Sequence, residues 1–304
     1  MPEPINPRGK DNPSQYVIED RNNEAEMVRL MIQDSTATAG MGGPLAEQAD
    51  PGRLHRMLDI GCGPGGWALE AAALYPQMEV VGIDISWRMI EYARAQARAR
   101  QVAERVTFVV MDALGPLDFA NGSFDLVNMR FGLSFLLVKD WPRVLAEFLR
   151  VTRPGGIVRI TDGDMWKTSS PACNRIAQMT LCALYRSGHS LNPEHTGVTG
   201  ELDRLLVESG CEQVQSKDYT FELEAGTVGA QSFYQDMMYG FQTGKPFLQE
   251  TGCAPEDYDA ICEQALLEMQ QPDFRVTWPL LTVWGSKRAD LATNEGPAQQ
   301  VPAN

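Results

Sequence analysis

The chain has 304 residues, of which 43% are hydrophobic and 22% charged, a composition typical of a globular protein with a substantial core. Its 40 acidic residues outnumber the 26 Lys and Arg residues, and the net charge of −14 disfavours nucleic acid and anionic membrane surfaces as partners. The six cysteines form no C-x-x-C pair and the longest apolar run, FGLSFLLV, is too short to span a bilayer, so we expect a cytoplasmic protein without disulfides or membrane segments.

The two ends of the chain differ in composition from the rest. Residues 1–15 and 288–304 are rich in Pro, Asn, Gln and Ala, which predicts disordered tails. The first residues also lack the apolar core of a signal peptide. We therefore expect one domain over residues 16–287.

Strand and helix patterns alternate through the first half of that domain. In chain order we expect strands over 57–60, 79–84, 106–111, 124–129 and 157–161, and helices over 65–74, 86–100 and 141–151. The strands are nearly continuous in apolar character, which is typical of parallel strands covered on both faces. The alternation predicts an α/β fold with a doubly wound, mostly parallel sheet.

This regularity breaks after Asp164. Helical patterns follow over 172–187, 201–209, 228–242 and 256–270, and strand patterns over 213–223 and 275–284. The two further strands bring the expected sheet to seven. We expect residues 165–196 and 225–272 to be helical insertions that together form a lid.

The stretch LDIGCGPGG, residues 58–66, places glycines between the first strand and the first helix of the alternating region. Such a loop lets backbone N–H groups approach a ligand closely. The spacing of Gly61, Gly63 and Gly66 also fits a loose dinucleotide fingerprint, so the glycines alone leave the ligand open. Asp59 lies two residues earlier, where a carboxylate would repel a pyrophosphate and attract an ammonium or sulfonium centre.

Two more carboxylates follow the next two strands. Asp84 ends the second strand, where it can accept hydrogen bonds from both ribose hydroxyls, although a helix cap is the alternative role. Asp112 follows the third strand and can accept from an adenine amino group, or it can simply start a turn. Three carboxylates without an obvious phosphate-binding lysine predict a cationic ligand that carries ribose and adenine, such as S-adenosylmethionine.

Five stretches in this order, LDIGCGPGG, VVGIDIS, VVMDA, FDLVNMRF and EFLRVTRPGG, resemble the class I S-adenosylmethionine-dependent methyltransferases. They cover about residues 55–163, and the resemblance implies a Rossmann-like fold and that cofactor. It is closest to the small-molecule type, including quinone-biosynthesis and secondary-metabolism enzymes. The segment YVIEDRNNEAEMVRL also resembles the first helix of fungal regulators that share this fold.

By this resemblance, the residues that contact the cofactor are Tyr16, Asp59, Gly61, Gly63, Gly65, Asp84, Ile85, Asp112, Ala113, Asn128 and Arg130. The three glycines would line the methionine portion, and Asp59 would support its amino group. Asp84 would hold the ribose. Ile85, Asp112 and Ala113 would contact the adenine.

The remaining three residues would enclose the cofactor. Asn128 and Arg130, at the end of the fourth strand, would face the methionine portion and the acceptor. A structural ion pair is the alternative role for Arg130. Tyr16 would close over the cofactor from the N-terminal segment.

Methyl transfer of this type is a displacement at an already activated methyl group, so alignment and exclusion of water matter more than a catalytic side chain. Where a base is needed, the candidates are His189 and His195 in the first insertion and Asp162 at the end of the fifth strand. The alternative for both histidines is an ordinary position in a surface loop. No ligand spacing indicates a metal site.

The insertions are rich in aromatic residues and Met, as in QSFYQDMMYGF, and such side chains form either an adaptable wall over a pocket or the core of the insertion itself. We predict a methyltransferase that acts on an apolar small molecule, such as a secondary metabolite or a quinone-like compound. A cofactor-binding regulatory protein and a nicotinamide-dependent oxidoreductase are the alternatives. The oligomeric state is open, and a homodimer is compatible with the sequence.

Overall fold

The computed structural model describes residues 16–18, 24–192, 194–195 and 197–289. The predicted tail over 1–15 lies outside the described residues, as does most of the tail over 288–304. Among the described residues, no helix is long and apolar enough to cross a membrane.

The strands are β1 (Arg56–Ile60), β2 (Glu79–Asp84), β3 (Val106–Val110), β4 (Phe124–Arg130), β5 (Thr152–Gly163), β6 (Lys167–Thr168), β7 (Cys211–Glu224) and β8 (Arg275–Lys287). The α-helices are α1 (Glu24–Met41), α2 (Gly66–Leu74), α3 (Trp87–Ala99), α4 (Trp141–Val151), α5 (Pro171–Arg186), α6 (Leu202–Glu208), α7 (Val228–Thr243), α8 (Lys245–Glu250) and α9 (Tyr258–Glu268). In the described ranges, four short 3-10 turns cover Pro51–Arg53, Gly132–Ser134, Val138–Asp140 and Thr199–Glu201.

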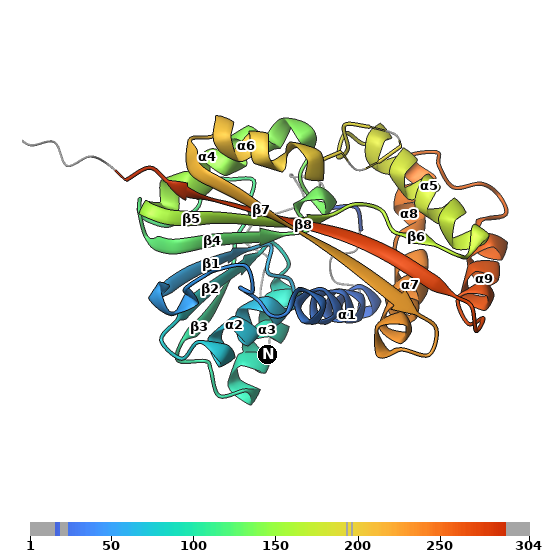
Figure 1. The fold of residues 1–304 in the computed structure, drawn as a ribbon, viewed down its shortest axis with the longest axis horizontal. Helices are drawn as coiled ribbons and strands as arrows, with labels where there is room; N and C mark the ends of the chain where they lie inside the picture. Colours follow the sequence, from blue (N-terminus) through green and yellow to red (C-terminus); the bar gives the residue numbers. More distant parts are fainter. Residues whose placement is uncertain (1–15, 19–23, 193, 196, 290–304) are drawn as a thin grey trace, which may run out of the picture.

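All strands belong to one sheet in the order β3-β2-β1-β4-β5-β8, and both β6 and β7 pair with β8 (Figure 1). β1 to β5 are parallel, whereas β8 is antiparallel to β5, β6 and β7. The predicted doubly wound, mostly parallel sheet is confirmed. The expected number of strands was too low by one, because the two-residue β6 is too short to show an alternating pattern in the sequence.

Each face of the sheet carries its own apolar layer. Side chains of a strand alternate between faces, so Leu58 and Ile60 pack with α4 and α6, whereas Met57 packs with Trp67 of α2. In Figure 1, α4 and α6 lie above the sheet and α1, α2 and α3 lie below it. Both layers bury large aromatic side chains, such as Phe148 in one and Trp67 in the other. The strands are therefore closely packed on both faces.

A further layer lies beyond one end of the sheet. There α5, α7, α8 and α9 share an apolar cluster with the first part of β8 (Figure 1). α1 runs beside α7 and contacts it. The helix α8 was not expected from the sequence. The helices α5, α7, α8 and α9 lie in the two predicted insertions. That they act as a lid remains a prediction.

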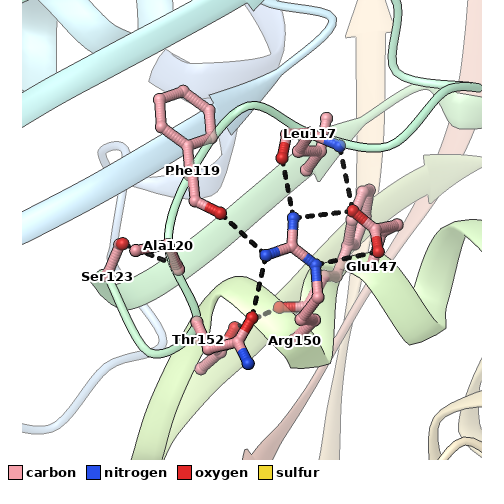
Figure 2. Close-up of polar contacts among 9 residues, drawn as sticks. Leu117, Phe119, Ala120, Ser123, Glu147, Arg150 and Thr152 are labelled. Atoms are coloured by element: carbon pink, nitrogen blue, oxygen red, sulfur yellow. Dashed lines mark hydrogen bonds and ion pairs between the residues drawn. The ribbon is translucent and has the colours of Figure 1, made fainter.

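Arg150 of α4 holds the loop between β3 and β4 to this helix (Figure 2). Its guanidinium donates to the carbonyl oxygens of Leu117 and Phe119, both at 2.7 Å, and to the Glu147 carboxylate at 2.8 and 2.9 Å. Glu147 in turn accepts from the Leu117 N–H at 2.9 Å. The loop that leaves the third strand is therefore held by a planar donor group rather than by apolar packing alone.

Candidate functional site

A cavity of about 380 Å³ opens where the parallel strands end. Its wall includes residues at or just after the carboxyl ends of β1, β2, β3, β4 and β5, together with side chains of α1, α5, α7 and α8. This edge is where open parallel sheets bind ligands, because loops and helix N-termini converge there. The predicted cofactor edge and the predicted lid thus face one cavity.

The glycine loop follows β1 and forms part of the wall. Gly61, Gly63 and Gly65 have φ angles of 65°, 51° and 83°, a left-handed region that favours glycine. Gly61 and Gly63 line the cavity, as expected. The structure places Gly65 behind the loop, since a Cβ there would lie 2.6 Å from the ring of Phe108. Gly65 therefore serves close packing of α2 on the sheet.

Asp84 joins the glycine loop to the next loop. One carboxylate oxygen accepts from the Gly63 N–H at 2.9 Å and the other from the Ser86 N–H at 2.8 Å. The cap of α3 is Ser86, whose hydroxyl accepts from the Met89 N–H. A carboxylate has about four acceptor positions, so Asp84 retains capacity for ribose hydroxyls while it fixes both loops.

The residues expected to contact adenine follow the ends of β2 and β3. Ile85, Asp112 and Ala113 all line the cavity, and Ile85 is 42% exposed. Asp112 also accepts from the Leu114 N–H at 2.9 Å, so the turn that was its alternative role is present as well. The two roles are compatible, because the turn orients the carboxyl group.

Asp59 is 4% exposed and lines the cavity beside the glycine loop. The Asn128 amide donates to its Oδ1 at 2.7 Å. Burial raises the pKa of Asp59 to about 7, and this hydrogen bond opposes the shift. Asn128 itself is fully buried and lies behind Asp59 rather than in the cavity wall, where the sequence had placed it.

Arg130 lines the cavity and is ion-paired with Asp34 of α1. Its Nη1 also donates to the Thr38 hydroxyl at 2.9 Å. The structural ion pair that was the alternative role for Arg130 is therefore present. Arg130 connects the end of β4 to α1, the helix that covers this side of the cavity.

A second polar cluster closes the cavity between α1 and α7. The Tyr16 hydroxyl donates to Glu26 at 2.5 Å, and Arg29 donates to Glu26 at 2.8 Å and to Asp236 at 3.2 Å. Thr243 donates to Glu26 at 3.1 Å. Tyr16 and Arg29 line the cavity. Sequence reasoning named only Tyr16 here, because nothing in the helical pattern of α1 marks the distant residues of α7 as its partners.

The three proposed catalytic residues lie in different surroundings. Asp162 lines the cavity, accepts from the N–H groups of Leu133 and Gly163, both at 2.9 Å, and has its pKa raised to about 7 by burial. His189 is buried beside Phe247, with Nδ1 2.8 Å from the Ser187 hydroxyl. His195 is exposed. Neither of these two histidines is part of the cavity wall.

The rest of the wall is mostly apolar, with aliphatic, Met and aromatic side chains. Phe131 and Trp278 stack with ring centroids 6.1 Å apart, and both line the cavity. The aromatic wall comprises Phe131, Trp166, Phe241, Phe247, Tyr258 and Trp278. Other aromatic and Met side chains of the insertions, such as Met179 and Phe233, pack into the helical layer instead. Some aromatic and Met side chains of the insertions therefore form part of the cavity wall, and others form the core of the insertion itself.

Within the described ranges, no group of three or more His, Cys, Asp and Glu side chains is arranged to hold a metal ion.

The comparison with known proteins concerns mainly the sheet half. The profile of a family described as a methyltransferase domain matches residues 57–156. A demethylmenaquinone methyltransferase of Geobacillus kaustophilus is 31% identical over 191 residues, which is 57% of this chain and 78% of that protein. Methyltransferase str2 of Strobilurus tenacellus is 31% identical over 141 residues, 46% of this chain and 47% of that protein. The chain thus spans about half the length of this second relative.

Among solved structures, phosphoethanolamine N-methyltransferase 2 of Haemonchus contortus in complex with S-adenosyl-L-methionine aligns with a TM-score of 0.45 and 23% identity. The alignment covers 77% of this chain and 49% of that one.

Proposed function

Because the chain belongs to the family of S-adenosylmethionine-dependent methyltransferases, we propose that it transfers the methyl group to an apolar small molecule held in the same cavity. The observation that carries this proposal is the continuity of the cavity. One space of about 380 Å³ joins the carboxylates at the strand ends to the aromatic wall, which includes Phe241 and Phe247 of the insertion helices. Donor and acceptor can therefore meet without solvent between them.

We assign the cofactor to the strand-end half of the wall. Asp59 would accept from the ammonium group of the methionine portion, and Asp84 from the ribose hydroxyls. Ile85 and Ala113 would contact the adenine ring and Asp112 its amino group. The charges agree, since the cofactor carries ammonium and sulfonium centres and this wall carries the carboxyl groups of Asp59, Asp84 and Asp112.

S-adenosylmethionine supplies an activated methyl group, so the chain has to align the acceptor, exclude water and, for some acceptors, remove a proton. The aromatic wall performs the first two tasks by enclosing a planar apolar molecule. We assign the third to Asp162, which lines the cavity near the end of β5. The positions of His189 and His195 outside the wall favour structural roles for both.

The proposed acceptor class is a quinone-like or other aromatic or isoprenoid molecule. The name of the Geobacillus kaustophilus relative indicates a quinone precursor as its substrate, and stacked rings such as Phe131 and Trp278 suit a planar acceptor. The net charge of −14 supports an acceptor other than nucleic acid. A cytoplasmic location is part of the proposal, and a homodimer is compatible with it.

Calorimetric titration with S-adenosylmethionine, S-adenosylhomocysteine and NADH tests the cofactor assignment. We expect the two adenosyl ligands to bind and NADH not to bind. A panel of demethylated quinols and phenols, with phosphoethanolamine and a DNA oligonucleotide as polar comparisons, tests the acceptor class through S-adenosylhomocysteine formation. Formation with the polar comparisons alone would overturn the acceptor assignment. Binding without any turnover would favour the alternative of a regulatory protein.

A further inference from the structure

Three polar side chains form a row across the buried part of the sheet. Asp59 of β1 pairs with Asn128 of β4, and Asn128 pairs with Arg159 of β5 in the strand register. Side chains at paired positions of neighbouring strands point to the same face. This face is otherwise apolar, because Met57 and Trp67 pack there. Asn128 and Arg159 are fully buried.

The row is continuously hydrogen-bonded and ends in a fourth residue. Arg159 donates through Nε and Nη2 to the Glu47 carboxylate, at 2.7 and 3.1 Å. Its Nη1 donates to Oδ1 of Asn128 at 2.6 Å. Nδ2 of Asn128 donates to Oδ1 of Asp59 at 2.7 Å. The side chains of Glu47 and Arg159 have no exposed surface.

The hydrogen-bond donors and acceptors of the row permit only one orientation of the Asn128 amide group. A guanidinium has only donors, so the group of Asn128 that faces Arg159 must be its carbonyl oxygen. The amide nitrogen of Asn128 must then face Asp59, whose Oδ1 must accept. This sets the orientation of the Asp59 carboxyl group. Among the described residues no group donates to the other oxygen, Oδ2, and Asp59 lines the cavity.

The charges of the row are unequal. The Glu47 carboxylate neutralises Arg159, so an ionised Asp59 is left without a full counter-charge in the buried row. A cationic group in the cavity would supply it. A buried ion pair contributes little net stability compared with apolar residues of the same size, so the stability of the sheet does not by itself require one here.

We propose that Glu47, Arg159 and Asn128 are positioning residues that orient the Asp59 carboxylate for the ammonium group of the cofactor. The inference rests on the proposed function, in which Asp59 accepts from that ammonium. The row then determines affinity for ligands that carry the amino acid portion and leaves the adenosine contacts at Asp84 and Asp112 unaffected.

Two ligands separate these contributions. S-adenosylhomocysteine carries the ammonium group, whereas 5′-methylthioadenosine has the same adenosine and thioether without the amino acid. Asn128→Asp keeps the acceptor for Arg159 and replaces the donor to Asp59 by a carboxylate oxygen. We expect this variant to bind S-adenosylhomocysteine about 10-fold more weakly or worse, and 5′-methylthioadenosine within about 2-fold of the unmodified protein.

A matched control lies two residues along β5. Thr161 is buried and its hydroxyl is 2.8 Å from that of Thr282, a buried polar contact without a link to Asp59. Thr161→Val should leave both affinities unchanged. The double variant Glu47→Leu, Arg159→Met removes both charges together and should reproduce the selective loss even where Asn128→Asp fails to fold.

The results overturn the inference if both ligands lose affinity equally, or if neither loses affinity. The variant Asp59→Asn distinguishes a failure of the positioning inference from a failure of the proposed function. Loss of the preference for S-adenosylhomocysteine in Asp59→Asn, but not in the Asn128 and double variants, would refute the positioning role and leave the site intact. Failure of the unmodified protein to bind either ligand would refute both.

Discussion

The two halves of the cavity wall hold their side chains in place by different means. At the strand ends, carboxylates accept from backbone N–H groups of loops anchored in the sheet, as Asp84 does from Gly63 and Ser86. In the helical layer, rings such as Phe241 and Phe247 are placed by packing among helices that are themselves insertions. Hydrogen bonds fix direction, whereas apolar packing tolerates rearrangement of similar volume. The first half suits one constant ligand, and the second suits acceptors that differ among related enzymes.

The largest effect is expected at Asp84, in the strand-end half of the cavity wall. Asp84→Ala removes the acceptor of two backbone N–H groups and the proposed ribose contact, so S-adenosylhomocysteine should bind about 100-fold more weakly or worse. Calorimetric titration measures this. Asp118→Ala, an exposed carboxylate outside the wall, is the matched control. Unchanged binding in Asp84→Ala would mean that the cofactor does not lie at the strand ends.

A change in the helical layer should affect the other ligand. Phe241→Ala removes a ring from the wall, and we expect kcat/KM for the acceptor to fall about 10- to 100-fold, since 1.4 kcal/mol of lost contact is a factor of ten. The affinity for S-adenosylhomocysteine should stay within about 2-fold. Steady-state kinetics and titration of the same preparation measure both. Equal losses of both would show that the halves are not independent.

The strand-end half should also respond to pH. Asp59 has a raised pKa of about 7, so it is mostly neutral at pH 6 and mostly a carboxylate at pH 8. Its attraction for an ammonium group is present above that pKa and is lost as the pH falls. Arg159 lowers and Asp84 raises the pKa of Asp59, and Asp59 in turn raises the pKa of the neighbouring Cys62 thiol.

We expect affinity for S-adenosylhomocysteine to rise about 10-fold from pH 6 to pH 8, and affinity for 5′-methylthioadenosine to change little. Titrations at both pH values measure this. A similar rise for both ligands would assign the effect to a group near the adenosine.

The smallest effect on either ligand is expected at Arg150, which lies outside the cavity wall. Arg150→Met leaves the carbonyl oxygens of Leu117 and Phe119 without this donor, so the free energy of unfolding should fall by about 1–3 kcal/mol. Both affinities should stay within about 2-fold. Urea denaturation measures the loss. Arg143→Met, an exposed arginine of the same helix, should change the free energy of unfolding by less than about 0.5 kcal/mol.

Much of the sheet half could be predicted from the sequence. Its signals are local: an apolar strand, then glycines or an aspartate, then a helix whose start is marked by a cap such as Ser86. The topology of parallel strands then brings Asp59, Asp84 and Asp112 to one edge. Strand β2 and helix α4 have the predicted bounds.

The features that the sequence did not predict are very short elements and contacts between residues far apart in the chain. The helix α8 is six residues long and β6 only two, too short for a period to be recognised. Arg159 sits in a strand with no local sign that its partner, Glu47, is 112 residues away. Asn128 was expected at the cavity wall because strand ends gather there, but its register beside Arg159 places it one layer deeper.

The cluster that joins α1 to α7 has a consequence for synthesis. Asp236 follows its partner Arg29 by 207 residues, and Thr243 follows its partner Glu26 by 217. At about 5–20 residues per second, the charged side of α1 waits on the order of 10–40 seconds for its partners. Arg130 of β4 can anchor Asp34 and Thr38 of α1 earlier, but the face that carries Glu26 and Arg29 is covered only once α7 follows, and a chain cut short before α7 would leave this face open to solvent and to chaperones.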